Sequence, residues 1–391
     1  MNLRGTIVVV NCGSSSVRVA LFDATGAHRV WTAHAERVGG RDGTLTIKEL
    51  AQVRAQPLVV PDQNAALRAI LNRLVQIGDG SPRAVGHRVV HGGQNFGTPQ
   101  PITIGVEQEL HTLIPFAPLH LPANLRGIAS VRSVWPDIPQ VACFDTMFHT
   151  TLPPAARELA LPREISGSEL RRYGFHGLSY EYILGALAEA EVDLLTERIV
   201  IAHLGSGASM CAIKEGKSVE TTMGFSPLSG LPMSSRCGDI DPGALLHLLT
   251  EKRLDPDELQ DMLYRRSGLA ALSEGSGDMQ DLLERQATDA AAASAVEFFC
   301  YHARRHIGAL AAVLGGIDRL VFTGGIGANA PDIRGKICNG LEFLGLALDR
   351  AHNETSRRRF STSDSAVIVE AMPTDEELVI ARHVLRTLTL A

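Results

Sequence analysis

Two glycine-rich turns, each between two runs of apolar residues, constrain the fold of this chain more than any other feature. Residues 199–213 read IVIAHLGSGASMCAI, so an apolar run reaches His203, turns through Gly-Ser-Gly and returns as a second apolar run. Residues 8–21 repeat this arrangement through Asn-Cys-Gly-Ser-Ser-Ser. Such glycines allow a tight turn close to a ligand, and bare amides beside hydroxyl groups suit phosphate oxygens. One turn alone fits an ordinary β-hairpin equally well, but the repetition predicts two related domains facing one ligand.

Length and composition are those of a globular chain with two domains. With 391 residues, the chain is longer than a typical domain with a single hydrophobic core. Of its residues, 45% are hydrophobic and 20% are charged. The net charge of −6 provides no basic field for nucleic acid or an acidic membrane. No apolar run approaches the roughly 20 residues of a membrane span, and no signal peptide is recognisable. The six scattered cysteines lack metal-ligand spacing, which favours reduced thiols in a soluble, cytoplasmic protein.

A third glycine turn, Thr-Gly-Gly-Ile-Gly, follows the apolar run 319–322. Helical periodicity precedes it over 289–314 and resumes at Asp332, so this turn leads from a strand toward a helix, where a nucleoside can lie against bare backbone. The sequence contains neither G-x-G-x-x-G with a downstream acid nor G-x-x-x-x-G-K-[ST], which excludes Rossmann and P-loop sites. Two phosphate hairpins and one such turn predict an actin-like, two-lobed nucleotide-binding architecture.

Periodicity also predicts the remaining elements. Further helices are expected over 64–77, 107–114, 123–134, 179–191, 242–250, 256–265 and from 376 onward. Further strands are expected over 84–90 and 140–144.

Ordered motifs along nearly the whole chain resemble those of the acetate kinase family, within the superfamily that also holds sugar kinases, heat-shock proteins and actin. The matching stretches are VVVNCGSSS (8–16), GHRVVHGG (86–93), FAPLHLP (116–122), ACFDTMFH (142–149), RRYGFHGLS (171–179), IAHLGSGAS (201–209), RCGDIDP (236–242), VFTGGIGAN (321–329) and PTDEELVIAR (373–382).

The resemblance implies an α/β fold of two actin-like (ribonuclease H-like) domains with a nucleotide cleft between them. The first domain would cover 1–147 and be completed by the C-terminal helix, 377–391. The second, 148–376, would carry the nucleotide-binding turns and a homodimer surface. The implied reaction is reversible, Mg²⁺-dependent phosphoryl transfer from ATP to acetate, giving acetyl phosphate and ADP by direct in-line transfer, with Mn²⁺ as an alternative metal. No nucleic acid or membrane partner is expected.

The resemblance also assigns roles to individual residues. Catalysis is assigned to Asp145, Arg88, Arg236, His176 and His120. The acyl substrate is assigned to Arg88, with Leu119, Phe175 and Pro227 as apolar walls. Strand alternation adds Val90 to these walls, because it lies two residues after Arg88 on the expected strand 84–90 and would face the same side. The nucleotide is assigned to Ser14, Ser16, His203, Gly205, Ser206, Gly207, Gly324, Gly325, Ile326 and Gly327. The metal is assigned to Asn11 and Glu376.

The chemistry of these residue types agrees with those roles. A carboxylate nucleophile is already ionised at neutral pH, so the reaction needs no catalytic base. What remains is in-line positioning and neutralisation of charge on the transferring phosphoryl group. Arginines bind planar anions at two points, histidines donate to phosphoryl oxygens, and carboxylates with water hold Mg²⁺.

Each of these residues also has a structural alternative. Arg88 alone is typical of a surface ion pair, and His120 or His176 alone of a structural histidine. Asp145 is suited to capping a turn after its strand, and Glu376 is suited to the positive end of a helix. The choice between structure and function also stays open for His91, His149 and His203.

Several positions depart from the family pattern. Ser206 replaces Asn, Ala328 replaces Glu, Asp375 replaces Asn, Tyr180 replaces His, Leu121 replaces Asn, and Ser234-Ser235 replaces Gly-Thr. These changes lie mainly around the nucleotide, so they leave the phosphoryl donor open.

Two rival functions also remain open. One is a kinase preferring propionate or butyrate. The other is a nucleotide-binding sensor with little turnover. Retention of the charged set argues against the sensor, because a decayed site usually loses its charged residues first.

Overall fold

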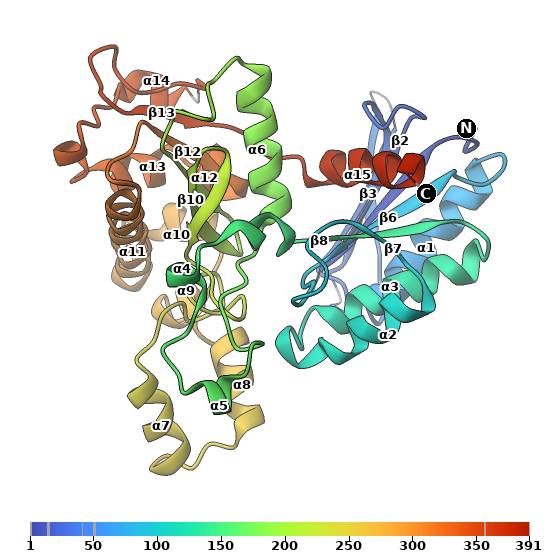
Figure 1. Ribbon diagram of the computed structural model, residues 1–391, viewed down its shortest axis with the longest axis horizontal. Coiled ribbons are helices and arrows are strands. Elements are labelled where there is room, and N and C mark those ends of the chain that lie inside the picture. The colour runs from blue at the N-terminus through green and yellow to red at the C-terminus, as the bar shows by residue number, and fades with distance from the viewer. Residues whose placement is uncertain (1, 14–15, 41, 50–51, 356, 391) are drawn as a thin grey trace. The chain divides into compact units, whose positions relative to one another are not determined.

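The computed structural model describes residues 2–13, 16–40, 42–49, 52–355 and 357–390, so Ser14 lies outside the described residues. The chain forms two compact units (Figure 1), Met1–Met147 with Asp375–Ala391, and Phe148–Thr374. Residues 375 and 376, expected in the second domain, group with the first unit. Within the described part of the chain, every helix is too short or too polar to span a lipid bilayer.

The first unit is built on a mixed sheet with the strand order β5-β4-β3-β2-β1-β6-β8-β7. Strands β1 and β2 form the expected antiparallel hairpin, while β6 runs parallel to both β1 and β8. The strands are β1 Ile7–Cys12, β2 Val17–Phe22, β3 Arg29–Glu36, β4 Thr44–Glu49, β5 Gln52–Pro57, β6 Ala84–Val89, β7 Gln100–Pro101 and β8 Gln140–Phe144. The helices are α1 Gln63–Ile77, α2 Ile104–Thr112, α3 Leu121–Val134 and α15 Glu376–Leu390, with a 3-10 turn at Ile114–Phe116.

Helices cover both faces of this sheet (Figure 1). On one face, Val8, Val10 and Val85 share a hydrophobic core with residues of α1 and α3. On the other face, α15 approaches β6 so closely that a Cβ added to Gly86 would lie 2.5 Å from Cγ2 of Ile380. Only a residue without a side chain permits this contact, so Gly86 fixes how α15 packs.

The alternation of side chains along β6 and its pairing with β1 position two of the predicted site residues, Arg88 and Asn11. Arg88 lies two residues after Gly86, so its side chain projects from the face covered by α15. The register Val10↔His87 between parallel β1 and β6 then brings Asn11 beside Arg88. The first residue of α15 is Glu376. Sheet register and helix packing therefore gather a polar set at one end of this unit.

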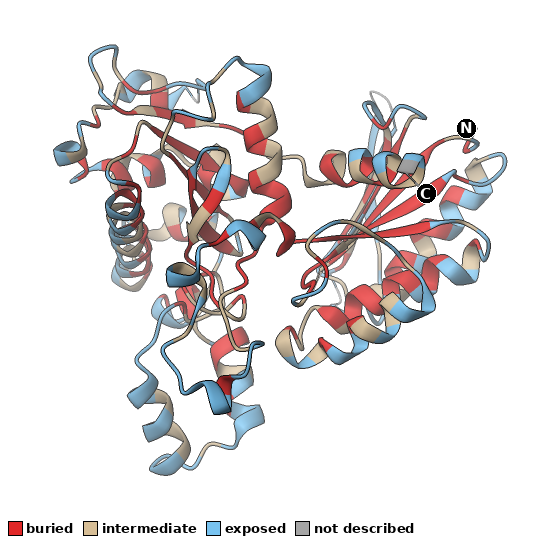
Figure 2. Cartoon of the chain, in the orientation of Figure 1, coloured by how far each residue is buried: buried red, intermediate tan, exposed pale blue. Residues whose placement is uncertain are grey.

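The second unit repeats the same strand pattern in a sheet of order β11-β10-β9-β12-β13. A hairpin joins β9 to β10, β11 pairs with β10, and β12 runs parallel to β9 and β13. This matches β3, β2, β1, β6 and β8 of the first unit, so the predicted repetition of a strand–turn–strand unit in an α/β fold is confirmed. Figure 2 shows buried residues following the strands of both sheets.

The elements of the second unit have the following bounds. The strands are β9 Ile199–Leu204, β10 Ala208–Lys214, β11 Lys217–Thr221, β12 Arg319–Thr323 and β13 Ile368–Ala371. The helices are α4 Pro154–Arg157, α5 Arg163–Ser166, α6 Gly177–Glu189, α7 Pro242–Thr250, α8 Pro256–Arg265, α9 Gly268–Leu272, α10 Met279–Arg285, α11 Ala290–Leu314, α12 Gly324–Asn329, α13 Pro331–Cys338 and α14 Arg350–Glu354. The 3-10 turns are Met147–Thr151, which begins in the first unit, and Glu342–Leu344.

Two local expectations need correction. The third glycine sequence is itself helical, because α12 begins at Gly324 directly after β12. Gly324 has φ +77°, and a Cβ there would lie 2.6 Å from the carbonyl oxygen of Leu204, so the close approach of the two segments requires glycine. The strand expected over 84–90 ends at Val89, which leaves Val90 just beyond it.

Candidate active site

A partly buried ion pair dominates the polar set of the first unit. Arg88 donates from Nε to Oδ1 of Asp145 at 2.8 Å and from Nη2 to Oδ2 at 2.7 Å. Its third nitrogen, Nη1, lies 3.4 Å from Oε2 of Glu376. Burial alone lowers the pKa of Arg88, but the charges of Asp145 and Glu376 outweigh burial and raise the pKa above its ordinary value. Arg88 therefore stays cationic and joins β6, the end of β8 and the start of α15.

Asp375, which replaces the family's usual Asn, caps α15 and carries an additional charge. Its Oδ1 accepts from the N–H of Leu378 at 3.0 Å. Arg29 on β3 pairs with this carboxylate and lies 3.4 Å from Oε2 of Glu377. Burial raises the pKa of Glu377, and the neighbouring charge of Glu376 raises it further, while Arg29 opposes both. The first turn of α15 is therefore anchored by a cation on each side.

The metal assignment fits a site with few protein ligands. Among the described residues, no group of three or more histidines, cysteines and carboxylates is arranged to hold an ion. The two residues assigned to the metal, Glu376 and Asn11, offer a carboxylate and an amide oxygen. Mg²⁺ commonly uses one or two protein oxygens and completes its shell with water and phosphate. The residues present therefore suit Mg²⁺ held together with a nucleotide.

The second unit holds His176 in an unusual backbone conformation before α6. Its φ of 58° lies in the left-handed region, which non-glycine residues seldom adopt and which often marks functional sites. Its ring stacks on that of His203 with centroids 4.3 Å apart. His176 Nδ1 lies 2.8 Å from Oγ of Ser209, and His203 Nδ1 lies 2.8 Å from Oγ of Ser179. The rings of both histidines are thus fixed in orientation.

The glycine turn between β9 and β10 leaves space beside His176. A Cβ added to Gly207 would lie 3.4 Å from Nε2 of His176 and 3.8 Å from Nη1 of Arg236. Arg236 is itself held by a hydrogen bond from Nη1 to the carbonyl oxygen of Pro227, at 3.1 Å. An imidazole nitrogen and a guanidinium thus border the space left by one missing side chain. A small anion placed there would meet both groups.

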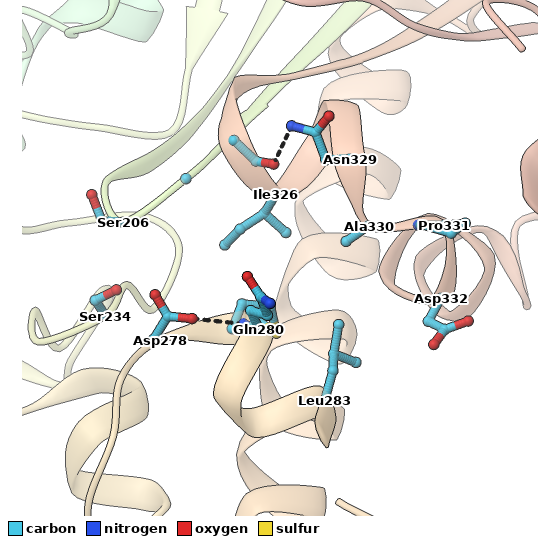
Figure 3. Close-up of a pocket in the computed structure, with 13 residues that line it drawn as sticks. Ser206, Ser234, Asp278, Gln280, Leu283, Ile326, Asn329, Ala330, Pro331 and Asp332 are labelled. Carbon is cyan, nitrogen blue, oxygen red and sulfur yellow. Dashed lines mark hydrogen bonds between the residues drawn. The ribbon is translucent and has the colours of Figure 1, made fainter. Parts of the chain in front are cut away.

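A pocket of about 410 Å³ lies next to this turn (Figure 3). It is lined by the Gly205–Ser206 turn, by Ser234, and by residues of α10, α12 and α13. Figure 3 shows the side chain of Ile326 pointing from α12 toward α10. The volume falls in the range of small-molecule sites. The turn of β9–β10 and the start of α12 meet here, since a Cβ on Gly205 would lie 3.8 Å from the backbone nitrogen of Gly325.

Not every residue assigned to the nucleotide lines this pocket. Gly205, Ser206, Gly325 and Ile326 do. The described residues assigned to the nucleotide that do not line it are Ser16, His203, Gly207, Gly324 and Gly327. Ser16 belongs to the first unit, where its carbonyl oxygen accepts from the N–H of Gly13 at 2.9 Å and closes the N-terminal turn.

The residues assigned to the acyl pocket are divided between the units. Val90 and Leu119 belong to the first unit, and Phe175 and Pro227 belong to the second. Val90 is buried, and its N–H donates to Oδ1 of Asn124 at 3.1 Å. His120, assigned to catalysis, precedes α3 and follows Leu119. The assigned roles of these residues stay predictions.

For two of the histidines whose role the sequence left open, His149 and His91, the surroundings favour a structural role. His149 is 3% exposed, with Nδ1 2.8 Å from Oγ of Ser218 and Nε2 3.0 Å from the carbonyl oxygen of Phe175. His91 is fully buried and accepts from the N–H of Gly93 at 2.9 Å. Both orient nearby backbone.

Sequence reasoning missed the α10 side of the pocket and the surroundings of His176. Asp278 caps α10 through bonds to the N–H groups of Gln280 and Asp281, and Gln280 lines the pocket (Figure 3). Asp278 follows Ser-Gly, and the apolar Met279 and Leu282 come one and four residues later, which is a recognisable helix start that could have revealed α10. The contact of Ser209 with His176 had no such local signal.

The chain is similar to known proteins over nearly its whole length. The Acetokinase family profile matches residues 6–382. An acetate kinase of Methylocella silvestris is 44% identical over 396 aligned residues, covering 98% of each chain. The crystal structure of Porphyromonas gingivalis acetate kinase has a TM-score of 0.86 at 35% identity, and that of a propionate kinase from Francisella tularensis has 0.89 at 33%. Both alignments cover 98% of this chain and 99% of the solved one.

Proposed function

The chain belongs to the acetokinase family, and from that membership we propose that it is an acetate kinase. It would transfer the γ-phosphoryl group of ATP to acetate, giving acetyl phosphate and ADP, and would catalyse the reverse reaction. The observation that best supports this is the space at Gly207. His176 and Arg236 border it, and the Gly205–Ser206 turn leads from it to the pocket.

The proposed roles follow from charge and geometry. Arg236 and His176 would neutralise and bind the transferring phosphoryl group, with the nucleoside in the pocket beside Ile326. Arg88 would bind the acyl carboxylate beside its pair with Asp145, and His120 would act on the phosphoryl group. Acetate needs no deprotonation at neutral pH, so these groups act by positioning and charge.

The proposed metal is Mg²⁺, with Mn²⁺ as a substitute of similar preference for oxygen ligands. Glu376 and Asn11 would hold it, directly or through water. When bound, the ion would reduce the negative charge on the phosphate oxygens. Asp145 would contribute by fixing Arg88, because it accepts hydrogen bonds from two nitrogens of that guanidinium.

The acceptor and donor are tested by one coupled assay. Acyl phosphate formation is measured with acetate, propionate and butyrate, each against ATP and GTP. Acetate with ATP should give the highest kcat/KM. The similarity to a propionate kinase makes propionate the main competing acceptor. Nucleotide binding without acyl phosphate formation from any acid would support a sensor instead.

Donor selectivity is proposed to be weaker than is usual in this family. Ser206 lines the pocket with a short side chain, and Ala328 replaces a longer polar residue on α12. Fewer side-chain contacts to the nucleotide leave fewer ways to reject GTP. A preference for ATP beyond roughly 10³-fold in kcat/KM would contradict this.

We also propose that the protein is a homodimer formed through the second unit. Helix α7 has the sequence PGALLHLLT, yet none of its residues is buried (Figure 2). Large apolar patches are uncommon on monomers and mark interaction sites. Light scattering should give twice the chain mass, and Leu246→Glu should reduce it to one. Val53→Glu in the first unit is the control, since both side chains are 62% exposed. A monomeric wild type would refute the proposal.

A cytoplasmic location is proposed on the state of the cysteines. All six are free thiols, and all except Cys237 are buried. Unpaired cysteines are typical of reducing compartments. Fractionation with thiol labelling under denaturing conditions should find the protein in the cytoplasm with all six cysteines reactive.

A further inference from the structure

The hydroxyl group of Ser209 lies between His176 and a buried tyrosine. Ser209 Oγ is 2.8 Å from Nδ1 of His176 and 2.5 Å from the phenol oxygen of Tyr180. Tyr180 lies on α6 and Ser209 on β10, and both are completely buried. Two side chains from the start of α6 and one from β10 thus form a short chain of hydrogen bonds that ends on an imidazole.

The direction of these hydrogen bonds follows from counting protons. Burial raises the pKa of Tyr180 well above its ordinary value, so the phenol keeps its proton. Among the described residues, Ser209 is the hydrogen-bond partner that the structure provides for this phenol. If Ser209 donated to Tyr180 instead, the phenol proton would be buried without an acceptor, which is costly. Tyr180 therefore donates to Ser209.

This direction determines which nitrogen of His176 carries a proton. The serine hydroxyl has one proton, and among the described residues His176 is the acceptor that the structure provides for it. Ser209 therefore accepts from Tyr180 and donates to His176, because its own proton would otherwise be buried without an acceptor. Nδ1 of His176 then acts as an acceptor. In a neutral imidazole with Nδ1 accepting, the proton is on Nε2.

We propose that Tyr180 and Ser209 are positioning residues that hold neutral His176 in its Nε2–H form. Nε2 then acts as a hydrogen-bond donor toward the space beside Gly207. This step rests on the proposed function, in which that space receives the transferring phosphoryl group.

The surroundings of Nε2 explain why its proton matters. The Cβ position missing at Gly207 lies 3.4 Å from Nε2 and 3.8 Å from Nη1 of Arg236. Arg236 can only donate, so an anion bound there would meet one certain donor. With a proton, Nε2 is a second donor; without one, it presents a lone pair to phosphoryl oxygens and repels them. The tautomer thus decides whether His176 assists or opposes transfer.

The direct test is the tautomer of His176 in solution. Nitrogen-15 spectra of histidine-labelled protein, with the signals assigned through a His176→Gln variant, report which nitrogen is protonated. Wild type should show the Nε2–H form. Tyr180→Phe and Ser209→Ala should each give a mixture of tautomers. Because the measurement needs no turnover, it remains informative even if the acyl kinase assay fails.

Kinetic measurements distinguish a positioning role from a general disruption of the fold. Tyr180→Phe should lower kcat about tenfold, in line with one disturbed hydrogen bond, and change the KM for MgATP by less than about twofold. The double variant with Ser209→Ala should lose no more than Ser209→Ala alone, because both act through the same bond. Tyr180→His should recover part of kcat, since an imidazole N–H can donate to Ser209.

Tyr173→Phe provides the matched control. Its phenol is also buried, at 4% exposed, and donates to the carbonyl oxygen of Glu169 at 3.0 Å. This variant should keep the tautomer of His176 and the wild-type kcat. The proposal is overturned if wild type carries the proton on Nδ1, a result that needs no variant to fold. An unchanged tautomer in both Tyr180→Phe and Ser209→Ala would also overturn it.

Discussion

The guanidinium of Arg88 donates two hydrogen bonds to the carboxylate of Asp145, with nitrogen–oxygen distances of 2.8 and 2.7 Å. Asp145 is only 1% exposed, so its negative charge depends on Arg88 for compensation. Arg88 was expected to bind substrate or to form a surface ion pair. It makes an ion pair, but a partly buried one at the end of the sheet where the assigned site lies. The same side chain therefore has a structural role and a proposed role in catalysis.

Replacing Arg88 with alanine should damage both stability and catalysis. The variant leaves a buried carboxylate without its partner, which costs about 3–5 kcal/mol in the free energy of unfolding. Loss of a cation that stabilises a phosphoryl transition state costs about 10³-fold or more in turnover. Urea unfolding and the coupled assay measure the two losses separately.

The double variant Arg88→Ala/Asp145→Ala separates these effects. Removing the carboxylate as well should restore much of the stability, because no uncompensated charge remains. Turnover should stay as low as in the single variant. A double variant as unstable as Arg88→Ala would show that packing, and not charge, causes the instability.

A pair of adjacent glycines offers a second prediction. Gly324→Ala should destabilise the protein by about 2 kcal/mol or more, since a left-handed backbone costs roughly 1–2 kcal/mol and the added methyl would meet the carbonyl oxygen of Leu204 at 2.6 Å. Gly325→Ala should leave stability within about 1 kcal/mol, because an added Cβ meets nothing within 4 Å.

For kinetics, the larger effect is expected from Gly325→Ala. Gly325 lines the pocket, so its new methyl group should occupy nucleotide space and raise the KM for ATP. Calorimetry and initial rates on both variants are the measurements. An unchanged KM for ATP in Gly325→Ala would place the nucleotide elsewhere.

Local signals were sufficient for most of the fold. The glycine hairpins, the helix breaks and the alternation in β1 and β9 each depend on residues close in sequence, and the structure has them. The repetition of the hairpin could be predicted because the same strand–turn–strand pattern occurs twice in the sequence. The short strands β11 and β13 were missed, since five and four residues give too little periodicity.

The pairings within the site could not be predicted in the same way. Arg88 and Asp145 are 57 residues apart and meet because β6 and β8 are neighbours in the sheet. Arg29 reaches Asp375 only because α15 returns to the first unit. Such contacts depend on tertiary packing, so residue types could suggest roles while the partners stayed hidden.

Two buried histidines predict how stability responds to acid. Burial lowers the pKa of both His87 and His149 from 6.5 to about 4. Between these values the unfolded chain binds protons that the folded protein does not, so stability falls as the pH falls through this range. Each histidine should cost about 2 kcal/mol between pH 7 and pH 5.

The variant His149→Gln measures one of these contributions. Lost hydrogen bonds will lower its stability at every pH, so the relevant quantity is the slope between pH 7 and pH 5, measured by urea unfolding. That slope should be shallower than in wild type. The exposed His111, changed to Gln, should leave the slope unchanged. Equal slopes in wild type and His149→Gln would mean that His149 is protonated in the folded protein.

The last prediction concerns the length of the acyl chain. Val90 follows the strand that carries Arg88, and its backbone is held by Asn124 at 3.1 Å. If Arg88 binds the carboxylate, Val90 is close enough in sequence to limit the alkyl end. One methylene is worth about 1–3 kcal/mol, so acetate should exceed propionate roughly 10- to 200-fold in kcat/KM. Val90→Ala should reduce this ratio, chiefly by improving propionate.

Val89→Ala is the matched control for this prediction. Val89 is fully buried and, as a neighbour on β6, faces the opposite side of the sheet from Arg88. It should lose stability while keeping the acetate-to-propionate ratio. If Val90 merely packs in the core, both variants will behave alike, with lower stability and an unchanged ratio. That result, or a wild type that uses propionate as well as acetate, would remove Val90 from the acyl pocket.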